Sequence, residues 1–187
     1  MTAETDGYLS GLVKGIVNVM AGGLPVLDDQ LQTAHERDQR TERGEHGQDG
    51  SSATIEIDPP PAADLRISYA PERDGEPDAG EVVWTWVPYE EHDGRGKDRP
   101  VLVIARLSPD RVFAVRLTSK AHDGDRDFLP IGPGPWDSKG RPSWVDIEQL
   151  YSVHHAGMRR EASGLDRARF DVVAQALHAR YGWTFGE

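Results

Sequence analysis

The sequence contains no cysteine. This absence excludes a disulfide framework and catalysis by a thiol, and it suits a protein of the reducing cytosol. Apolar runs long enough to form a transmembrane helix are missing as well. The first residues, MTAETDGYLSG, carry acidic side chains where a secretory signal would carry basic ones. We therefore expect a cytoplasmic protein.

Sets of metal ligands are also scarce in the sequence. The chain has 7 histidines, and their positions do not follow the spacing of a zinc site. The sequence accordingly predicts neither a bound metal nor an organic cofactor.

Basic residues are scarce only in the first part of the chain. The net charge of the 187 residues is −11. Residues 1–80 hold 16 acidic and 6 basic side chains, whereas residues 81–187 hold 16 acidic and 15 basic ones. The second part can therefore present a basic groove even though the whole chain is acidic. Hydrophobic residues make up 37% of the chain, which is sufficient for one modest core.

Helical periodicity is present in residues 8–20, YLSGLVKGIVNVM. The apolar side chains recur at the spacing of one helix face, and Gly7, Gly11 and Gly15 line a second ridge. We interpret residues 1–27 as a short amphipathic helix. Docking on the protein's own body is the interpretation that we favour, although such a ridge also permits pairing with another helix or contact with a membrane.

Residues 28–79 are acidic, poor in apolar side chains and interrupted by three consecutive prolines. Such a composition buries too little surface to offset the entropy of ordering, so it predicts a largely disordered linker. The segment LRISYAP, residues 65–71, is the one strand-like stretch within it.

After residue 80 the pattern changes to short runs of β-branched and aromatic residues. Strands are predicted at residues 81–89, 99–105, 111–119, 143–147 and 150–153. A helix is predicted from Leu165 to Arg180, with one apolar face and with Gly182 as its stop. Residues 80–187 are thus expected to form a small β-barrel that the C-terminal helix caps.

Four motifs follow one another in this region, ahead of the final helix: GEVVW, GKDRPVLVI, RLTS and SWVDIEQL. In this order they resemble the PemK/MazF family of toxins from toxin-antitoxin systems, over residues 80–182. The resemblance implies an SH3-like barrel, usually a homodimer, that cleaves single-stranded RNA as a sequence-specific, metal-independent endoribonuclease. It also implies a cognate antitoxin protein as partner. The leading 80 residues form an extension that minimal family members lack.

The central candidate of this region is Arg99, which precedes Pro100. A proline favours an extended backbone for the residue before it, and a held guanidinium offers several donors to phosphate oxygens. By resemblance, Arg99 is the catalytic arginine and Thr118, at the end of the next strand, is its hydroxyl partner. Antiparallel pairing of the two strands would bring them together. Ser119 is a further candidate beside Thr118.

Other side chains near this pair have supporting roles in the prediction. Lys97 and Lys120 flank the pair and are expected to attract RNA phosphates. His122 is a candidate proton shuttle near neutral pH, with a solvated loop histidine as the alternative. Four tryptophans either stack on bases or belong to the core or to a dimer contact: Trp84, Trp86, Trp136 and Trp144.

The general base has no assignment in the sequence. Several family members carry a glutamate five positions before the arginine, and this chain has Gly94 there. Asp93 is a candidate base, as are Glu90 and Glu91 in the same loop. The missing glutamate favours an alternative function, a catalytically inactive barrel that binds nucleic acid or a protein partner. A third hypothesis is an adaptor that the N-terminal helix tethers to a membrane or partner.

Overall fold

The computed structural model describes residues 46–72, 76–91 and 93–186. These residues belong to a unit that spans Thr41–Glu187, while a second unit spans Met1–Arg40. The predicted helix of residues 1–27 falls in that second unit, outside the described residues.

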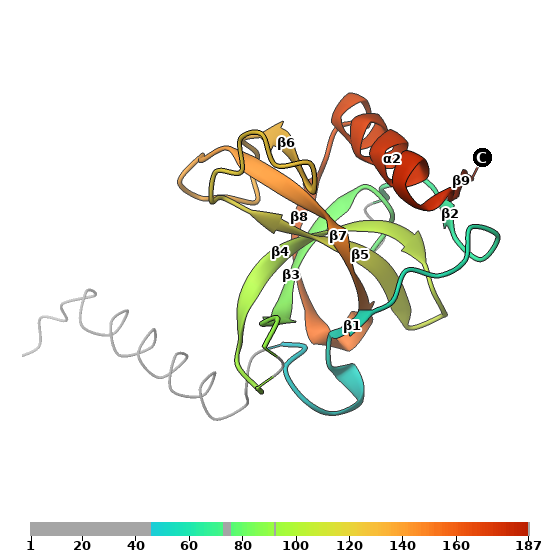
Figure 1. The fold of residues 1–187 in the computed structure, drawn as a ribbon. Helices are drawn as coiled ribbons and strands as arrows, with labels where there is room; N and C mark the ends of the chain where they lie inside the picture. Colours follow the sequence, from blue (N-terminus) through green and yellow to red (C-terminus); the bar gives the residue numbers. More distant parts are fainter. Residues whose placement is uncertain (1–45, 73–75, 92, 187) are drawn as a thin grey trace, which may run out of the picture. The chain divides into compact units, whose positions relative to one another are not determined.

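The described chain is mainly β, with a helix near its C-terminus (Figure 1). In chain order the elements are η1 Gly50–Ser52, β1 Ile55–Ile57, β2 Arg66–Ile67, β3 Glu81–Pro88, β4 Gly96–Arg106, β5 Arg111–Thr118, β6 Phe128–Gly132, β7 Ser143–His154, η2 His155–Gly157, β8 Met158–Gly164, α2 Arg167–Tyr181 and β9 Thr184–Phe185. The main sheet has the order β1-β7-β5-β4-β3-β8, with β6 also paired to β7, and every pair in it is antiparallel. This arrangement confirms the predicted mainly β fold with a C-terminal helix, whereas the SH3-like closure stays a prediction.

One face of the main sheet packs against α2. Leu102 of β4 and Leu117 of β5 belong to the same buried cluster as Phe170, Val173 and Leu177 of α2. In a strand, every second side chain points to the same face, so the intervening residues lie on the opposite face. The apolar face predicted for the helix is therefore the one that the sheet covers.

The ends of α2 follow from local capping. The Asp166 carboxylate accepts the backbone N–H of Arg169 at 3.0 Å, which satisfies one of the free donors of the first turn. Gly182 has a φ of 74° and donates its N–H to His178 O at 2.8 Å. Gly182 thus ends the helix, as the sequence predicts.

The opposite face of the sheet holds a second, smaller buried cluster. Its members include Val101 and Val103 of β4, Ala114 of β5 and Tyr151 of β7. Arg99 is two residues before Val101 and so lies on this same face. The candidate arginine is therefore part of a sheet surface that is partly apolar and partly charged.

Residues 46–72 are ordered, so the predicted disorder of residues 28–79 is wrong for this segment. Leu65 and Ile67 are each 1% exposed and belong to the core that α2 covers. The short strand β1 adds to the edge of the sheet by antiparallel pairing with β7. The average composition of the whole segment did not reveal these buried residues. A few buried side chains and one edge strand are sufficient to order residues 46–72. Residues 28–45 lie outside the described residues.

The start of this segment is fixed against β3. Trp86 donates its backbone N–H to His46 O at 2.8 Å, and the hydroxyls of Thr54 and Thr85 are 2.6 Å apart in a buried hydrogen bond. Gly47 has a φ of 82°, and a Cβ there would approach the Thr85 hydroxyl to 2.4 Å. The segment therefore covers the second cluster's side of β3 by direct contact.

Several strand boundaries differ from the prediction. β4 begins at Gly96, three residues earlier than expected, and residues 143–154 form one continuous strand in place of two. β6, with the sequence FLPIG, is a strand that was not among those predicted. β8, with the polar sequence MRREASG, is ordered by pairing with β3 at the sheet edge.

Candidate functional site

The ends of β4 and β5 border a pocket of about 230 Å³. Val101 pairs with Arg116 across these strands, and continuing this register by two residues places Thr118 opposite Arg99. Six of the candidates named from the sequence line the pocket: Lys97, Arg99, Thr118, Ser119, Lys120 and Trp136. The structure therefore brings the predicted arginine and hydroxyl residues together.

The Arg99 side chain is half-buried and has no counter-ion within the described part of the chain. None of the described residues forms a hydrogen bond or an ion pair with it, and its Nε is shielded from solvent. Burial, and secondarily the charge of Arg116, hold the pKa of Arg99 below its ordinary value. A guanidinium nevertheless stays protonated near neutral pH. Arg99 thus presents an uncompensated positive charge at the pocket.

Thr118 is oriented by a local hydrogen bond. Its Oγ1 accepts the backbone N–H of Lys120 at 3.2 Å. The hydroxyl donates to no described residue, so its proton is available for a bound acceptor. Lys97 and Lys120 are exposed, which suits side chains that attract a polyanion.

His122 and Asp93 are among the predicted candidates that do not line the pocket. His122 stacks on Phe128 with ring centroids 3.6 Å apart, and its Nδ1 is 3.5 Å from a carboxylate oxygen of Asp125. Asp93 accepts hydrogen bonds from the backbone N–H and the Nε of Arg95, at 3.0 and 2.7 Å. Both side chains are thus held by contacts within their own loops.

Glu90 is the predicted loop carboxylate that lies beside an arginine of the site. Its Oε1 is 3.8 Å from Nη2 of Arg116, and its side chain is 70% exposed. Gly94, at the position where the resemblance expects a glutamate, has a φ of 83° and open space around the position of a Cβ. The loop thus leaves room at residue 94 but supplies no side chain there.

The two carboxylates that line the pocket are engaged by arginines. Asp98 accepts a hydrogen bond from Nη2 of Arg159. Asp137 accepts one from Nε of Arg141 at 2.9 Å, and this hydrogen bond holds the pKa of Asp137 below its ordinary value. Both carboxylates are therefore engaged by an arginine, and neither is marked as the general base.

Sequence reasoning missed Arg116, Asp146 and Tyr151, which lie near Arg99 but do not line the pocket. Arg116 Nη2 and Asp146 Oδ2 are 2.5 Å apart, and their side chains are only 12% and 3% exposed. Tyr151 donates its hydroxyl to Gln149 Oε1 at 2.7 Å, and burial is the main cause that raises the pKa of this phenol. The available signal was a single charged residue inside an apolar strand, as in AVRLT and WVDI.

The tryptophans divide between core and half-buried positions. Trp136 and Trp144 are 1% and 9% exposed, and Trp136 donates its N–H to Ser143 Oγ at 3.1 Å. These two are core residues, in agreement with one of the two predicted roles. Trp84 and Trp86 are half-buried on β3, so base stacking stays a prediction for them.

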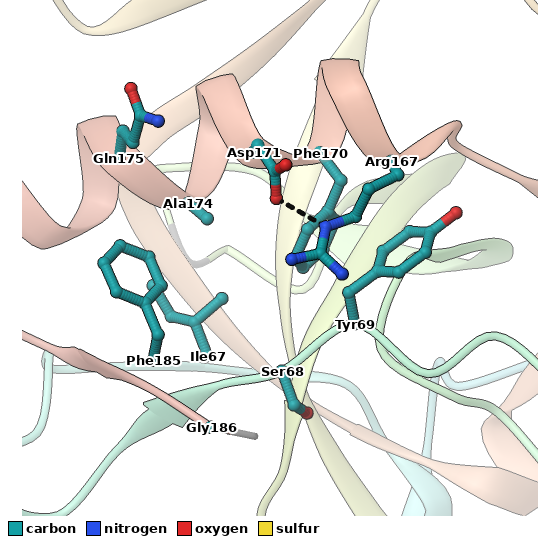
Figure 2. Close-up of a pocket in the computed structure, with 10 residues that line it drawn as sticks. All are labelled: Ile67, Ser68, Tyr69, Arg167, Phe170, Asp171, Ala174, Gln175, Phe185 and Gly186. Carbon is teal, nitrogen blue, oxygen red and sulfur yellow. Dashed lines mark hydrogen bonds and ion pairs between the residues drawn. The ribbon is translucent and has the colours of Figure 1, made fainter.

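A second pocket, of about 250 Å³, lies between α2 and the segments around β2 and β9 (Figure 2). Its charged side chains satisfy one another, since Arg167 Nε donates to Asp171 at 2.8 Å. The Arg167 guanidinium also lies 5.2 Å from the centroid of the Tyr69 ring. We therefore place the candidate site at the first pocket, where a cation lacks such partners.

Metal-binding clusters and membrane-spanning helices are both absent from the described residues. These residues contain no group of three or more histidine, aspartate or glutamate side chains arranged to hold a metal ion. None of their helices has the length and apolar character needed to span a membrane.

Fold and site together define a small, mainly β protein with a cationic pocket at the ends of two adjacent strands. Residues 78–180 match the family described as PemK-like, MazF-like toxin of type II toxin-antitoxin system. This match covers more than half of the chain, so the protein belongs to the PemK/MazF family. The resemblance carried by the four motifs is thereby confirmed.

The chain is also similar to several solved structures. A MazE–MazF complex from Deinococcus radiodurans is 20% identical, with 57% of this chain and 96% of that chain covered and a TM-score of 0.44. A mycobacterial endoribonuclease in complex with its cognate antitoxin is 18% identical, with coverages of 59% and 100% and a TM-score of 0.45. The Mycobacterium tuberculosis toxin MazF-mt6 is 16% identical, with coverages of 55% and 99% and a TM-score of 0.40. No curated protein sequence matches the chain significantly.

Proposed function

We propose that this protein is a cytoplasmic endoribonuclease toxin that cleaves single-stranded RNA at specific sequences. The observation that carries the proposal is the Arg99 guanidinium, which lies half-buried at the pocket without a counter-ion from the described chain. Such a charge is costly to bury unless it binds an anion. A phosphodiester is the anion that family membership suggests.

Cleavage without metal proceeds by attack of a ribose 2′-OH on the adjacent phosphate. The chain must then stabilise the negative charge that develops on the phosphate oxygens. Arg99 donates to these oxygens, and the Thr118 hydroxyl donates a second hydrogen bond from the opposite strand. Lys97 and Lys120 attract the RNA backbone. The attacking hydroxyl loses its proton and the leaving 5′ oxygen gains one, by groups that we leave unassigned.

The proposed partners are the RNA, a second copy of the chain and an antitoxin. The descriptions of two similar structures name a MazE–MazF complex and an endoribonuclease with its cognate antitoxin. Family membership extends this expectation to the present chain. A homodimer is proposed on the same basis.

A second candidate function is RNA or partner binding without cleavage. It is favoured by Gly94, where no carboxylate is available, and by the ion pairs that occupy Asp98 and Asp137. The two functions differ in whether the folded protein cuts RNA.

The test compares the wild-type chain with Arg99→Ala and with the control Arg106→Ala. Arg106 lies at the other end of β4, where it pairs with Glu76 at 2.9 Å. We expect Arg99→Ala to fold and to lose cleavage by about 100-fold or more, because one donor to the developing charge is removed. Arg106→Ala should cleave like the wild type. Cleavage by a folded Arg99→Ala variant at the wild-type rate would refute the assignment.

A further inference from the structure

Arg116 shares a sheet face with Arg99. It is paired with Val101, and Arg99 is two residues from Val101 along β4, so the two arginines are diagonal neighbours. Side chains in this relation are within reach of each other when they are long. The positive charge of Arg116 is the second cause, after burial, that lowers the pKa of Arg99. The two arginine side chains therefore start from neighbouring, half-buried positions of one sheet face.

The carboxylates of the described chain form ion pairs with only one of these two arginines, Arg116. Asp146 binds Arg116 at 2.5 Å and is itself nearly buried. Glu90 lies 3.8 Å from Arg116, but it is mostly exposed, so solvent screens its charge. The buried phenol of Tyr151 stays neutral because its pKa is raised. Within the described part of the chain, Asp146 and Glu90 pair with Arg116, whereas no carboxylate pairs with Arg99.

Both arginines also retain unused donors. The Nε atoms of Arg99 and Arg116 are shielded from solvent and have no hydrogen-bond partner in the described part of the chain. An unpaired N–H in such a place is costly, which favours binding of an acceptor that reorients the guanidinium groups. Phosphate accepts from arginine through several oxygens, so it suits two guanidinium groups at once.

We propose that Arg116 and Arg99 bind the same phosphate group, with Asp146 holding Arg116 in place. This proposal rests on the proposed function for its RNA substrate, while the phosphate site itself is independent of cleavage. Arg116 is a phosphate-binding residue on this account, and its ion pair with Asp146 orients it before substrate binds. The alternative is a purely structural ion pair, with Arg99 as the only phosphate ligand.

The first experiment tests the phosphate site without RNA. Inorganic phosphate is titrated into the full-length protein, and the Nε–H signals of Arg99, Arg116 and Arg106 are followed by NMR. We expect the signals of Arg99 and Arg116 to move with one common dissociation constant while that of Arg106 does not. A response of Arg99 alone, or of neither, would overturn the proposal. A common response in a protein that cuts no RNA would refute the proposed function and leave the phosphate site standing.

The second experiment measures affinity for an RNA that cannot be cut because its 2′ positions are methylated. Asp146→Asn removes the competing negative charge but keeps an oxygen that accepts the hydrogen bond from Arg116, so Arg116 stays in place and binding should tighten several-fold if it binds phosphate. Adding Arg116→Gln to this variant should weaken binding about tenfold, the loss typical of a charged hydrogen bond. It should also lower the slope of log affinity against log salt by about 0.7, the value for one phosphate contact on a single strand.

The same series separates binding from a structural role. Replacing Arg116 and Asp146 together avoids leaving a buried charge unpaired, and melting curves check that each variant is folded. Arg106→Gln is the matched control, since it removes an ion-paired arginine from a neighbouring strand. If the double variant and Asp146→Asn bind the methylated RNA with equal affinity and equal salt slope, Arg116 is only structural and the proposal is wrong.

Discussion

At the scale of the residue, Arg99 is held by the sheet more than by its proline. It lies inside β4 and pairs with Thr85 of β3, whereas the sequence pattern predicts it at the start of a strand. An extended backbone for Arg99 could be predicted because Pro100 restricts the residue before it. The pairing with β3 could not, because it depends on residues 96–98 joining the strand. Strand pairing thus fixes the backbone of Arg99, whereas a fixed guanidinium stays a prediction because no described residue bonds to it.

The hydroxyl of Thr118 provides a prediction at the same scale. Thr118→Val should lower the cleavage rate by about 100-fold, because the donor to the phosphate is lost while the shape of the side chain is kept. Thr118→Ser retains the hydroxyl and should stay within a few-fold of the wild type. Single-turnover cleavage rates check this, with melting temperatures as the control for folding. Equal rates for the valine and serine variants would exclude a role for the hydroxyl.

The residues of the site differ in how far the sequence reveals them. Arg99, Thr118 and their lysines stand in motifs, so the sequence pattern by itself marks them. Arg116 and Asp146 lie in strands that are predicted, but their meeting depends on the register between β5 and β7, which contains an irregularity between Val115 and Leu117. Strand periodicity alone does not supply such a register.

At the scale of the element, the segment before the family region is an integral part of the sheet. The residues from His46 to Ile57 contact β3 and β7, although composition predicts disorder for them. The strands β3, β4 and β5 and the helix α2 could be predicted because their apolar patterns are long and regular. Edge strands such as β1 and β8 have short or polar sequences, and only pairing with a neighbour orders them.

Two glycines in this segment allow a matched test of its docking. Gly47 and Gly50 both have a positive φ, of 82° and 71°, so alanine costs about 1 kcal/mol at either position. A Cβ at Gly47 would also meet Thr85, Gly157 and Thr54 atoms within 2.8 Å, whereas nothing lies within 4 Å of one at Gly50. We expect Gly47→Ala to lower the free energy of unfolding by about 2 kcal/mol more than Gly50→Ala. Urea unfolding of the full chain measures the difference, and equal losses would show that the segment is not docked against β3.

At the scale of the whole molecule, the charge is unevenly divided between extension and family region. Residues 1–80 contain 16 acidic and 6 basic side chains, while residues 81–187 are nearly balanced. The cationic pocket belongs to the second part, which also contains most of the family match of residues 78–180. The overall acidity of the chain is therefore compatible with a site for RNA phosphates.

The central claim is that the chain cuts RNA by internal attack of a 2′-OH. The most direct measurement uses the purified full-length protein with EDTA and a single-stranded RNA whose cut site has been mapped, and analyses the products by mass spectrometry. A second substrate carries deoxyribose at the nucleotide before the cut. The account predicts a 2′,3′-cyclic phosphate on the first substrate, no cleavage of the second, and about 100-fold or more slower product formation with Arg99→Ala. Cleavage of the deoxy substrate, or loss of activity in EDTA, would contradict the account.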